Sequence, residues 1–418
     1  MELMEMKYKE TEVGLIPEDW ICIEFGKLIS NLCYGPRFSS KDYSRDGNVK
    51  TIRGTDINLL GDINYEQVPK AKLPYELVRE HKLLDGDLVM ITTADCGLTG
   101  VYIDDGFPYI ASAYAVRISL NPEAHPLFFK YIYQTNFAKK QIELYIRKGT
   151  VGNLPGSDIY KFKFPLPPTL QEQKAIATAL SDVDELISNL ELLITKKKAI
   201  KLGVMQQLLT PPHKGGKRLD GFTGEWVEKK LGDLFDFKTS NSKKHFFDLS
   251  GDLIVMDMGS ISVEGKILKS KRANCNFDIL KKNDLIMPKD DIGGGNIIGK
   301  VAYIDKDDSY LLSDHVFRLK TLTNHLDALY FSYLINSSIV NTSILKVVSG
   351  SAQLGLGLNT IKNLTVCYNS NPESQIRIGK ILLDIDLELE QLETKKTKYQ
   401  HIKQGMMQEL LTGKTRLV

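Results

Sequence analysis

The sequence has little cysteine and no arrangement of cysteines that would bind a metal. Five cysteines are spread over 418 residues, with no Cys-x-x-Cys pair and no neighbouring histidines to complete a tetrahedral zinc site. The chain also lacks a run of about 18 uncharged apolar residues that could span a bilayer, and its first residues, MELMEMKYKETEVG, lack the apolar core of a secretory signal. We therefore expect reduced thiols, no metal site, no membrane contact and a cytoplasmic location.

A strong charge of one sign is missing as well. The net charge at pH 7 is +2, and the shares of apolar (42%) and charged (25%) residues are those of an ordinary globular protein. Bulk electrostatics therefore cannot carry a nucleic-acid role, which would need local clusters of lysine and arginine. The length exceeds one ordinary core and predicts two or more domains.

What the sequence does have is a long internal repeat. Segment 170–210, LQEQKAIATALSDVDELISNLELLITKKKAIKLGVMQQLLT, aligns without a gap with segment 372–412, PESQIRIGKILLDIDLELEQLETKKTKYQHIKQGMMQELLT, at an offset of 412 − 210 = 202. Weaker matches precede both segments in the same order, from Trp20 with Trp226 to SAYAVRI with SDHVFRL. The chain therefore consists of a globular part followed by a long helix, and this arrangement occurs twice. The repeat predicts internal pseudo-two-fold symmetry.

Signals for helix ends bound both repeated segments. In the first, Thr169 opens a T-x-x-E capping-box pattern and Pro211 follows the last helical residues. In the second, Asn371 is a favourable N-cap, Pro372 suits the first helical position and Gly413 suits a left-handed C-terminal cap. Both segments are therefore predicted to be single long helices.

Apolar residues within both helices recur at alternating steps of four and three, the pattern of a coiled-coil seam. At about 1.5 Å per residue each helix would be roughly 60 Å long, and such a helix with one apolar stripe is not stable alone. Because the two halves are related by symmetry, we predict that the helices pair antiparallel, with one globular part at each end. The predicted seam consists of Ile176, Leu180, Val183, Ile187, Leu190, Ile194, Ile378, Leu382, Ile385, Leu389 and Leu392.

Lysines interrupt both seams. Lys197 and Lys201 do so in the first helix, and Lys396 and Lys403 do so in the second. Their charges either specify the register of the pair or extend outward to water along the apolar surface. We favour the outward arrangement.

The globular halves are predicted to be mixed α and β. The clearest candidates are strands at 87–93, 114–120, 284–288 and 316–320 and helices at 125–148 and 326–346.

The loops around these elements are rich in lysine, arginine, aromatic and small polar residues. A DNA reader needs such loops, because phosphate contacts position the protein and side chains at base edges choose the sequence. By loop position and repeat equivalence we select as candidate DNA-binding residues Arg37, Lys41, Arg45, Lys50, Arg53, Thr92, Thr93, Tyr114, Lys243, Lys244, Lys271, Arg272, Lys289 and His315.

Two sets of residues resemble parts of catalytic motifs, but neither forms a complete motif that both halves share. Segment 294–301, GGNIIGKV, resembles a phosphate-binding loop, but Val301 stands where Ser or Thr must hold magnesium, and a strand is predicted to follow instead of a helix. Asp257 with Glu264-x-Lys266 has nuclease-like residue types, but the first half has no equivalent set. We therefore predict no catalytic residues in this chain.

The segments LIPEDW, LPPTLQEQKAIATALSDVDELI, MQQLLT, GFTGEW and MQELLTGKTRLV together resemble the specificity subunit of type I restriction-modification systems, and the resemblance covers essentially the whole chain. It implies a non-catalytic, sequence-specific DNA-binding subunit. Each of two target-recognition domains would read one half-site of a bipartite target, and the chain would direct methyltransferase and restriction subunits to it.

The resemblance also implies partners and cofactors. The partners are double-stranded DNA, methyltransferase subunits, two per chain, and restriction subunits. S-adenosylmethionine, ATP and Mg would belong to these partner subunits, which methylate adenine at N6 and cleave DNA with ATP, and this chain would hold no cofactor.

These arguments predict an α+β fold, with two pseudo-symmetric mixed α/β target-recognition domains separated by two long helices that form an antiparallel coiled coil. Two alternatives remain open: the recognition part of another restriction or modification system, and a coiled-coil adaptor without a DNA role. The expected boundaries are 1–168 for the first target-recognition domain, 169–210 for the first long helix, 211–370 for the linker and the second domain, and 371–418 for the second long helix and the C-terminal tail.

Overall fold

The computed structural model describes residues 7–218, 220–269, 271–291, 294–350 and 354–417, and the other positions of the predicted ranges lie outside the described residues. The chain divides into two compact units. The first unit contains residues 1–190 and 395–418, and the second unit contains residues 191–394. Each unit therefore holds one globular half, the first part of the long helix that follows it, and the last part of the other long helix.

An antiparallel sheet lies at the centre of the first unit. Its strands, in spatial order, are β4 (Ile29–Tyr34), β10 (Ala115–Leu120), β7 (Leu88–Ile91) and β8 (Thr99–Val101). β7 is apolar at every position because it is buried on both faces. Leu88 and Met90 pack into one core, and Val89 and Ile91 pack into a second.

A smaller sheet closes the second core of this unit. β5 (Val49–Ile52) pairs in parallel with β9 (Tyr109–Ala111) and antiparallel with β6 (Lys70–Ala71). The remaining elements are β1 (Tyr8–Thr11), β2 (Gly14–Pro17), β3 (Ile21–Glu24), β11 (Lys163–Leu166), α1 (Tyr75–His81), α4 (Gly156–Ile159), η1 (Phe25–Leu28), η2 (Ser40–Asp42) and η3 (Gly54–Asp56).

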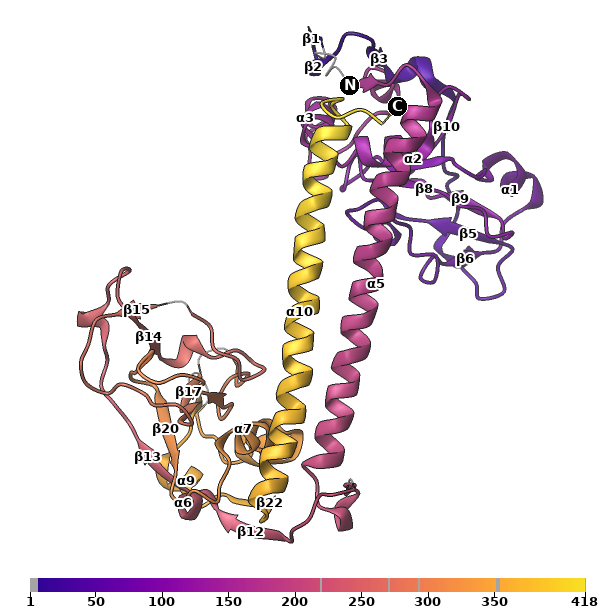
Figure 1. The fold of residues 1–418 in the computed structure, drawn as a ribbon. Helices are drawn as coiled ribbons and strands as arrows, with labels where there is room; N and C mark the ends of the chain where they lie inside the picture. Colours follow the sequence, from indigo (N-terminus) through magenta and orange to yellow (C-terminus); the bar gives the residue numbers. More distant parts are fainter. Residues whose placement is uncertain (1–6, 219, 270, 292–293, 351–353, 418) are drawn as a thin grey trace. The chain divides into compact units, whose positions relative to one another are not determined.

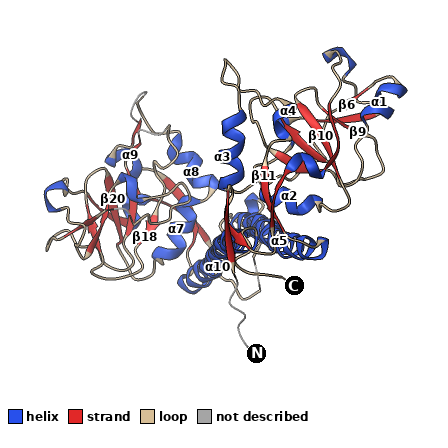
Figure 2. Cartoon of the chain, turned by 90° about the horizontal axis from the view of Figure 1, so that it is seen from above, coloured by secondary structure: helices blue, strands red, loops and turns tan. Residues whose placement is uncertain are grey.

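Two helices cover the first core where the sequence predicts a single helix. α2 (Pro126–Ile132) and α3 (Asn136–Tyr145) are separate because the Thr135 hydroxyl accepts a hydrogen bond from the Ala138 backbone N–H at 3.3 Å and starts a new helix. In Figure 2, α2 lies between β10 and the long helix α5 (Leu170–Leu208), so it connects the sheet to that helix.

The second unit repeats this topology. Its main sheet has the order β13 (Phe235–Lys238), β20 (Val316–Thr321), β16 (Leu285–Pro288) and β18 (Ala302–Tyr303). A smaller sheet is again present, in which β14 (Leu253–Met256) pairs in parallel with β19 (Tyr310–Leu312) and antiparallel with β15 (Arg272–Ala273). The remaining elements are β12 (Trp226–Lys230), β22 (Thr365–Asn369), β17 (Asp290–Asp291), β21 (Leu354–Gly355), α6 (Leu231–Leu234), α7 (Ala328–Asn336), α8 (Ser338–Leu345), α9 (Leu358–Lys362), η4 (Pro212–Lys214), η5 (Lys244–Phe246) and η6 (Met258–Ser260). The shared strand order confirms the predicted pseudo-symmetric α+β fold.

The long helices α5 and α10 (Pro372–Leu410) have 39 residues each, and their predicted caps are confirmed. The Thr169 hydroxyl accepts from the Glu172 N–H at 3.2 Å, and the Asn371 side-chain oxygen accepts from the Ser374 N–H at 3.0 Å. Gly413 follows α10 with a φ of +72°. The Glu172 carboxylate, expected to close a capping box, is bonded to Arg416.

The two helices run antiparallel within each unit (Figure 1). Ile187, Leu190, Ile194 and Leu389 of the predicted seam are buried. Val183, Ile385 and Leu392 are partly buried.

The first seam residues of each helix belong to the domain cores. Ile176 and Leu180 lie in the first core with Leu410, and Ile378 and Leu382 lie in the equivalent core of the second unit. This end of each helix therefore docks on its own globular half as well as on the other helix. Within the described residues, no helix is long and apolar enough to cross a bilayer.

Candidate nucleic-acid interface

Three strand ends of the first unit meet at one edge. β5 and the β9–β10 turn are joined there, because the Ser112 N–H donates to the Ile52 carbonyl at 2.9 Å. The end of β7 joins them, because the Thr92 N–H and hydroxyl donate to the Tyr114 carbonyl at 2.9 and 3.0 Å. We call Arg53, Thr92, Thr93 and Tyr114, which stand at these strand ends, the first rim.

The second unit builds the same edge. The Ser313 N–H donates to the Met256 carbonyl at 3.1 Å, and the Lys289 N–H donates to the His315 carbonyl at 3.0 Å. The strand ends here carry Asp257, Lys289, Asp290, Asp314 and His315, which we call the second rim.

The two rims share their backbone but differ in side chains. By strand position, Asp257 replaces Arg53, Lys289 replaces Thr92 and Asp290 replaces Thr93. His315, which has a φ of +62°, stands in place of Tyr114. Each unit therefore has one structural edge with its own chemistry.

Arg53 is the dominant group of the first rim. Asp56, whose side chain is fully buried, accepts from Arg53 Nε at 3.0 Å, from Nη2 at 2.9 Å and from the Arg53 backbone N–H at 2.9 Å. The hydrogen bonds that Arg53 donates to Asp56 raise the pKa of Arg53, so its guanidinium stays charged. The Tyr114 residue has 65% of its surface exposed, whereas Thr92 is buried and its hydroxyl is bonded to the Tyr114 carbonyl.

Carboxylates surround the cations of the second rim. His315 Nδ1 lies 2.7 Å from Asp290 Oδ2, and its Nε2 lies 3.5 Å from Asp314 Oδ2. Burial alone would raise the pKa of Asp314, but the hydrogen bond from Ser313 and the charge of His315 outweigh burial and lower it. Asp257 is ion-paired with Lys271.

The sequence argument did not select these carboxylates as DNA-binding residues because it looked for cations. Carboxylates on a base-reading surface accept from the exocyclic amino groups of bases. Strand equivalence was the signal that could have found Asp257, since it occupies the position of Arg53. Tyr43 was missed too: it is 40% exposed, stacks edge-on against Phe38 with ring centroids 5.3 Å apart, and lies on the loop that leads to Arg53.

Several predicted residues are exposed on loops of the two units. They are Arg37, Lys41 and Arg45 in the first unit and Lys244 in the second. Thr93 and Lys289 are partly buried at the strand ends, where the Lys289 ammonium lies 6.0 Å from the Phe317 ring centroid.

Three other candidates, Lys50, Arg272 and Lys243, are bound to protein groups. Lys50 donates to the Tyr109 hydroxyl at 2.5 Å and lies 3.8 Å from Asp105. Arg272 donates to the Gly251 carbonyl at 2.5 Å.

Lys243 is 2% exposed and ion-paired with Asp278 at 2.9 Å, which removes it from the surface that DNA can reach. Burial would raise the pKa of Asp278, but its hydrogen bonds with Lys238, Ser240 and Lys243 hold the pKa well below the usual value. The lysine therefore anchors a loop. In the described part of the chain, no group of three or more His, Cys, Asp or Glu side chains is placed to hold a metal ion.

A second pair of matching clusters joins each globular half to the two long helices. In the first joint (Tyr131, Asp184 and Lys403), Asp184 accepts from the Tyr131 hydroxyl at 2.9 Å and pairs with Lys403 at 2.6 Å. In the second joint (Tyr333, Asp386 and Lys201), the equivalent distances are 2.8 and 2.6 Å.

Burial, followed by the neighbouring carboxylate, raises the pKa of both joint tyrosines well above the usual value. Each phenol therefore stays protonated and donates to its aspartate.

The joints correct the predicted outward arrangement of the seam lysines. The side chain of Lys403 is 7% exposed and that of Lys201 is 20% exposed, and each is paired with an aspartate of the opposite helix. Lys197 also pairs across the helices, with Glu388 at 2.6 Å, and Lys396 is partly buried. Paired charges inside a seam specify register, because a shifted register would bury them without partners.

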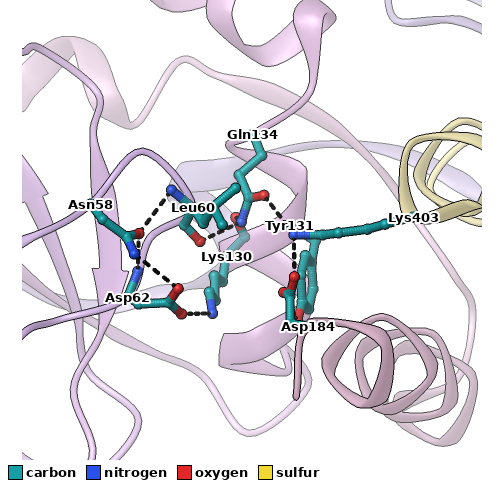
Figure 3. Close-up of polar contacts among 8 residues, drawn as sticks. All are labelled: Asn58, Leu60, Asp62, Lys130, Tyr131, Gln134, Asp184 and Lys403. Carbon is teal, nitrogen blue, oxygen red and sulfur yellow. Dashed lines mark hydrogen bonds and ion pairs between the residues drawn. The ribbon is translucent and has the colours of Figure 1, made fainter. Parts of the chain in front are cut away.

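Polar contacts continue from the first joint toward the first rim (Figure 3). Gln134 lies 3.5 Å from Lys403 and donates to the Leu60 carbonyl at 2.7 Å, while Lys130 pairs with Asp62 at 2.5 Å. The loop that follows Arg53 is thereby fixed to α2 and the helix pair. The second unit differs here, because Asn336, at the position of Gln134, bonds to the backbone of Val301.

Comparisons with known proteins agree with this architecture. The family model for the type I restriction modification DNA specificity domain matches twice, over residues 17–201 and 223–403. The chain is similar to the putative type I restriction enzyme MjaX specificity subunit of Methanocaldococcus jannaschii, with 28% identity over 56% of this chain and 57% of that protein, so the match spans little more than half of the relative's length.

Two further proteins give broader coverage. The type I restriction enzyme MjaVIII specificity subunit of the same organism is 26% identical over 70% of each chain. The crystal structure of the type I restriction-modification system S subunit from M. genitalium has the same fold, with a TM-score of 0.65 and 17% identity over 98% of this chain and 99% of that one. With its family model matched over most of its length, the chain belongs to the type I restriction modification DNA specificity family and carries two copies of the specificity domain.

Proposed function

We propose that this chain is the DNA-binding specificity subunit of a type I restriction-modification system, in which each unit reads one half-site of a bipartite target. The observation that carries this proposal is the pair of rims, which have the same strand ends but different side chains. A protein that reads two unlike half-sites needs such an arrangement, because the backbone positions the reader and the side chains choose the bases.

The long helices would set the spacing between the half-sites. Each has 39 residues, which corresponds to roughly 60 Å at 1.5 Å per residue. The paired lysines and aspartates of the joints would hold the helices in one register. A fixed register would give a fixed number of base pairs between the half-sites.

Catalysis would belong to partner subunits. The chain would bind double-stranded DNA and recruit methyltransferase subunits, two per chain, together with restriction subunits. S-adenosylmethionine, ATP and Mg would be held by those partners, with adenine N6 methylation and ATP-dependent cleavage carried out there. This chain's own residues would bind and orient the DNA.

Mapping of methylated adenines tests the proposal directly. The chain is co-expressed with type I methyltransferase subunits, and methylated adenines are located across the genome by single-molecule sequencing. We expect one split motif with a fixed spacer. Exchanging residues 1–168 for the equivalent part of another specificity protein should change one half-site, and exchanging residues 211–370 should change the other. An unsplit motif, or none, contradicts the proposal.

Two simpler experiments exclude the alternatives. Purified chain is incubated with labelled S-adenosylmethionine and DNA, and methyl transfer without any partner would make it an enzyme in its own right. Binding to duplexes that carry or lack the mapped motif is then compared. Equal affinity for both duplexes would leave a helical adaptor without a DNA-reading role.

A further inference from the structure

Arg53 is held in one orientation by a buried partner. It follows β5 directly and precedes the short turn η3, where Asp56 accepts from its backbone N–H, its Nε and its Nη2. Asp56 has no exposed side-chain surface, so it cannot move aside without leaving the core. An arginine fixed in this way loses less conformational entropy when it binds a ligand than a free arginine does.

The outer part of this guanidinium remains available. A guanidinium has five N–H groups, and the two-point contact with Asp56 uses the edge formed by Nε and one Nη2 hydrogen. Asp56 does not use the edge formed by Nη1 and the second Nη2 hydrogen, and the side chain is 42% exposed. Two parallel donors on one planar edge match the O6 and N7 acceptors that guanine presents in the major groove.

We propose that Arg53 reads a guanine in the half-site of the first unit, by donating from Nη1 and Nη2 to guanine O6 and N7, and that Asp56 is its positioning residue. This inference rests on the proposed function and adds the identity of one base to it. Adenine would be rejected because its N6 amino group, a donor, stands where guanine has O6.

The second unit supplies an internal contrast. Its equivalent strand end carries Asp257, which is ion-paired with Lys271. An acceptor group there cannot bind guanine O6 and N7. The guanine requirement therefore belongs to one half-site, and a substitution of Arg53 should leave the reading of the other half-site unchanged.

The test uses the full chain in complex with its methyltransferase subunits and duplexes that carry the mapped motif. Each guanine is replaced in turn by 7-deazaguanine, which lacks the N7 acceptor, or by inosine, which keeps O6 and N7 but lacks the minor-groove amino group. With the unchanged protein, one 7-deazaguanine position in one half-site should weaken binding about 10-fold or more, and inosine at that position should not.

Arg53→Lys keeps the charge beside Asp56 but removes the planar edge. We expect it to lower the preference for that guanine about 10-fold or more and to weaken the effect of 7-deazaguanine, because an ammonium group contacts O6 and N7 without the planar pair of donors, with the other half-site read as before. Asp56→Asn should lower the same preference by a smaller factor, although Arg53 is still present. Arg79→Lys is the matched control, because Arg79 of α1 is an exposed arginine of the same unit that also pairs with a carboxylate, Glu76, and its variant should keep the motif.

Reading of the second half-site and an unchanged melting temperature report that each variant is folded. The inference is overturned if no half-site guanine is sensitive to 7-deazaguanine, or if Arg53→Lys and the unchanged protein are equally sensitive. A split motif obtained with either of these results leaves the proposed function standing. The absence of any split motif would instead remove the proposed function, and the inference with it.

Discussion

The joints and the rims are both present twice in this chain, but they differ in what is repeated. The joints are built from the same three residue types, Tyr131, Asp184 and Lys403 in one unit and Tyr333, Asp386 and Lys201 in the other. The rims repeat strand ends and hydrogen bonds, while their side chains change from Arg53 to Asp257 and from Tyr114 to His315. Because the joints are the same and the rims differ, the two units present different side chains on the same scaffold.

The largest expected effect is the loss of a joint aspartate. Asp184→Ala leaves Lys403, which is 7% exposed, as a buried charge without its carboxylate, and should lower the free energy of unfolding of the first unit by about 4 kcal/mol. Asp386→Ala leaves the more exposed Lys201 and should cost about 2 kcal/mol. Urea unfolding of both variants measures the difference, and equal costs would show that burial does not distinguish the joints.

The second largest effect on stability is expected from replacement of Arg416, because its contacts differ from those of the equivalent residue in the other half. Arg416 binds Glu172, whose side chain is 1% exposed, and also binds Asp19. Arg416→Met should therefore cost about 3 kcal/mol of unfolding free energy.

Lys214, at the repeat position of Arg416, is the matched control. It lies 3.6 Å from the exposed Glu228, so Lys214→Met should change stability by less than about 1 kcal/mol. A large effect of Lys214→Met, or a negligible effect of Arg416→Met, would contradict the distinction.

A smaller effect, dependent on pH, is expected from Asp278. Because its pKa is lowered in the folded protein, its stabilisation is present above the usual value of 3.8 and is lost as the pH falls below it. Asp278→Asn, which also tolerates the positive φ of this position, should cost about 2 kcal/mol at pH 7 and progressively less below pH 3.8.

The first unit offers an uncharged comparison for that experiment. The Tyr34 hydroxyl accepts from the Gly156 N–H at 2.7 Å and so holds the loop that begins at Tyr34 without an ion pair. Tyr34→Phe should therefore lower stability by an amount that does not change between pH 7 and pH 4. A pH-independent Asp278→Asn effect would show that the ion pairs of Asp278 do not stabilise the loop.

The smallest effects should come from single side chains on the rims. Tyr114→Ala should change the affinity for one half-site by about 1 kcal/mol, and His315→Ala should change the affinity for the other half-site by a similar amount. Competition binding with duplexes altered in one half-site separates these effects. If either variant altered both half-sites, the assignment of one rim to each half-site would fail.

The sequence predicted the repeated elements well because their signals are local. Thr169 and Asn371 cap helices through hydrogen bonds to residues three positions away, and the apolar periodicity of 170–208 and 372–410 needs no knowledge of distant partners. The single helices expected over 125–148 and 326–346 were wrong, because the cap formed by Thr135 divides the first and the extended residue Ser337 separates α7 from α8 in the second. The repeat predicted two halves with the same fold, and the shared strand order of their main sheets confirms it.

The candidate site was less predictable because the whole fold decides which cations are buried and which stay exposed. Lys243 and Arg53 look alike as loop cations, yet one is buried against Asp278 and the other is held at an exposed edge by Asp56. Lys403 was expected to face water and instead pairs with Asp184, more than two hundred residues earlier in the chain.

The sequence by itself determined the doubled architecture, the two long helices and their ends, because periodicity, caps and a gap-free repeat are properties of the linear chain. The tertiary structure alone decided which lysines turn inward and which side chains meet on each rim. Those choices depend on the partner that burial supplies, since a charge stays at the surface unless another part of the fold brings a carboxylate to it.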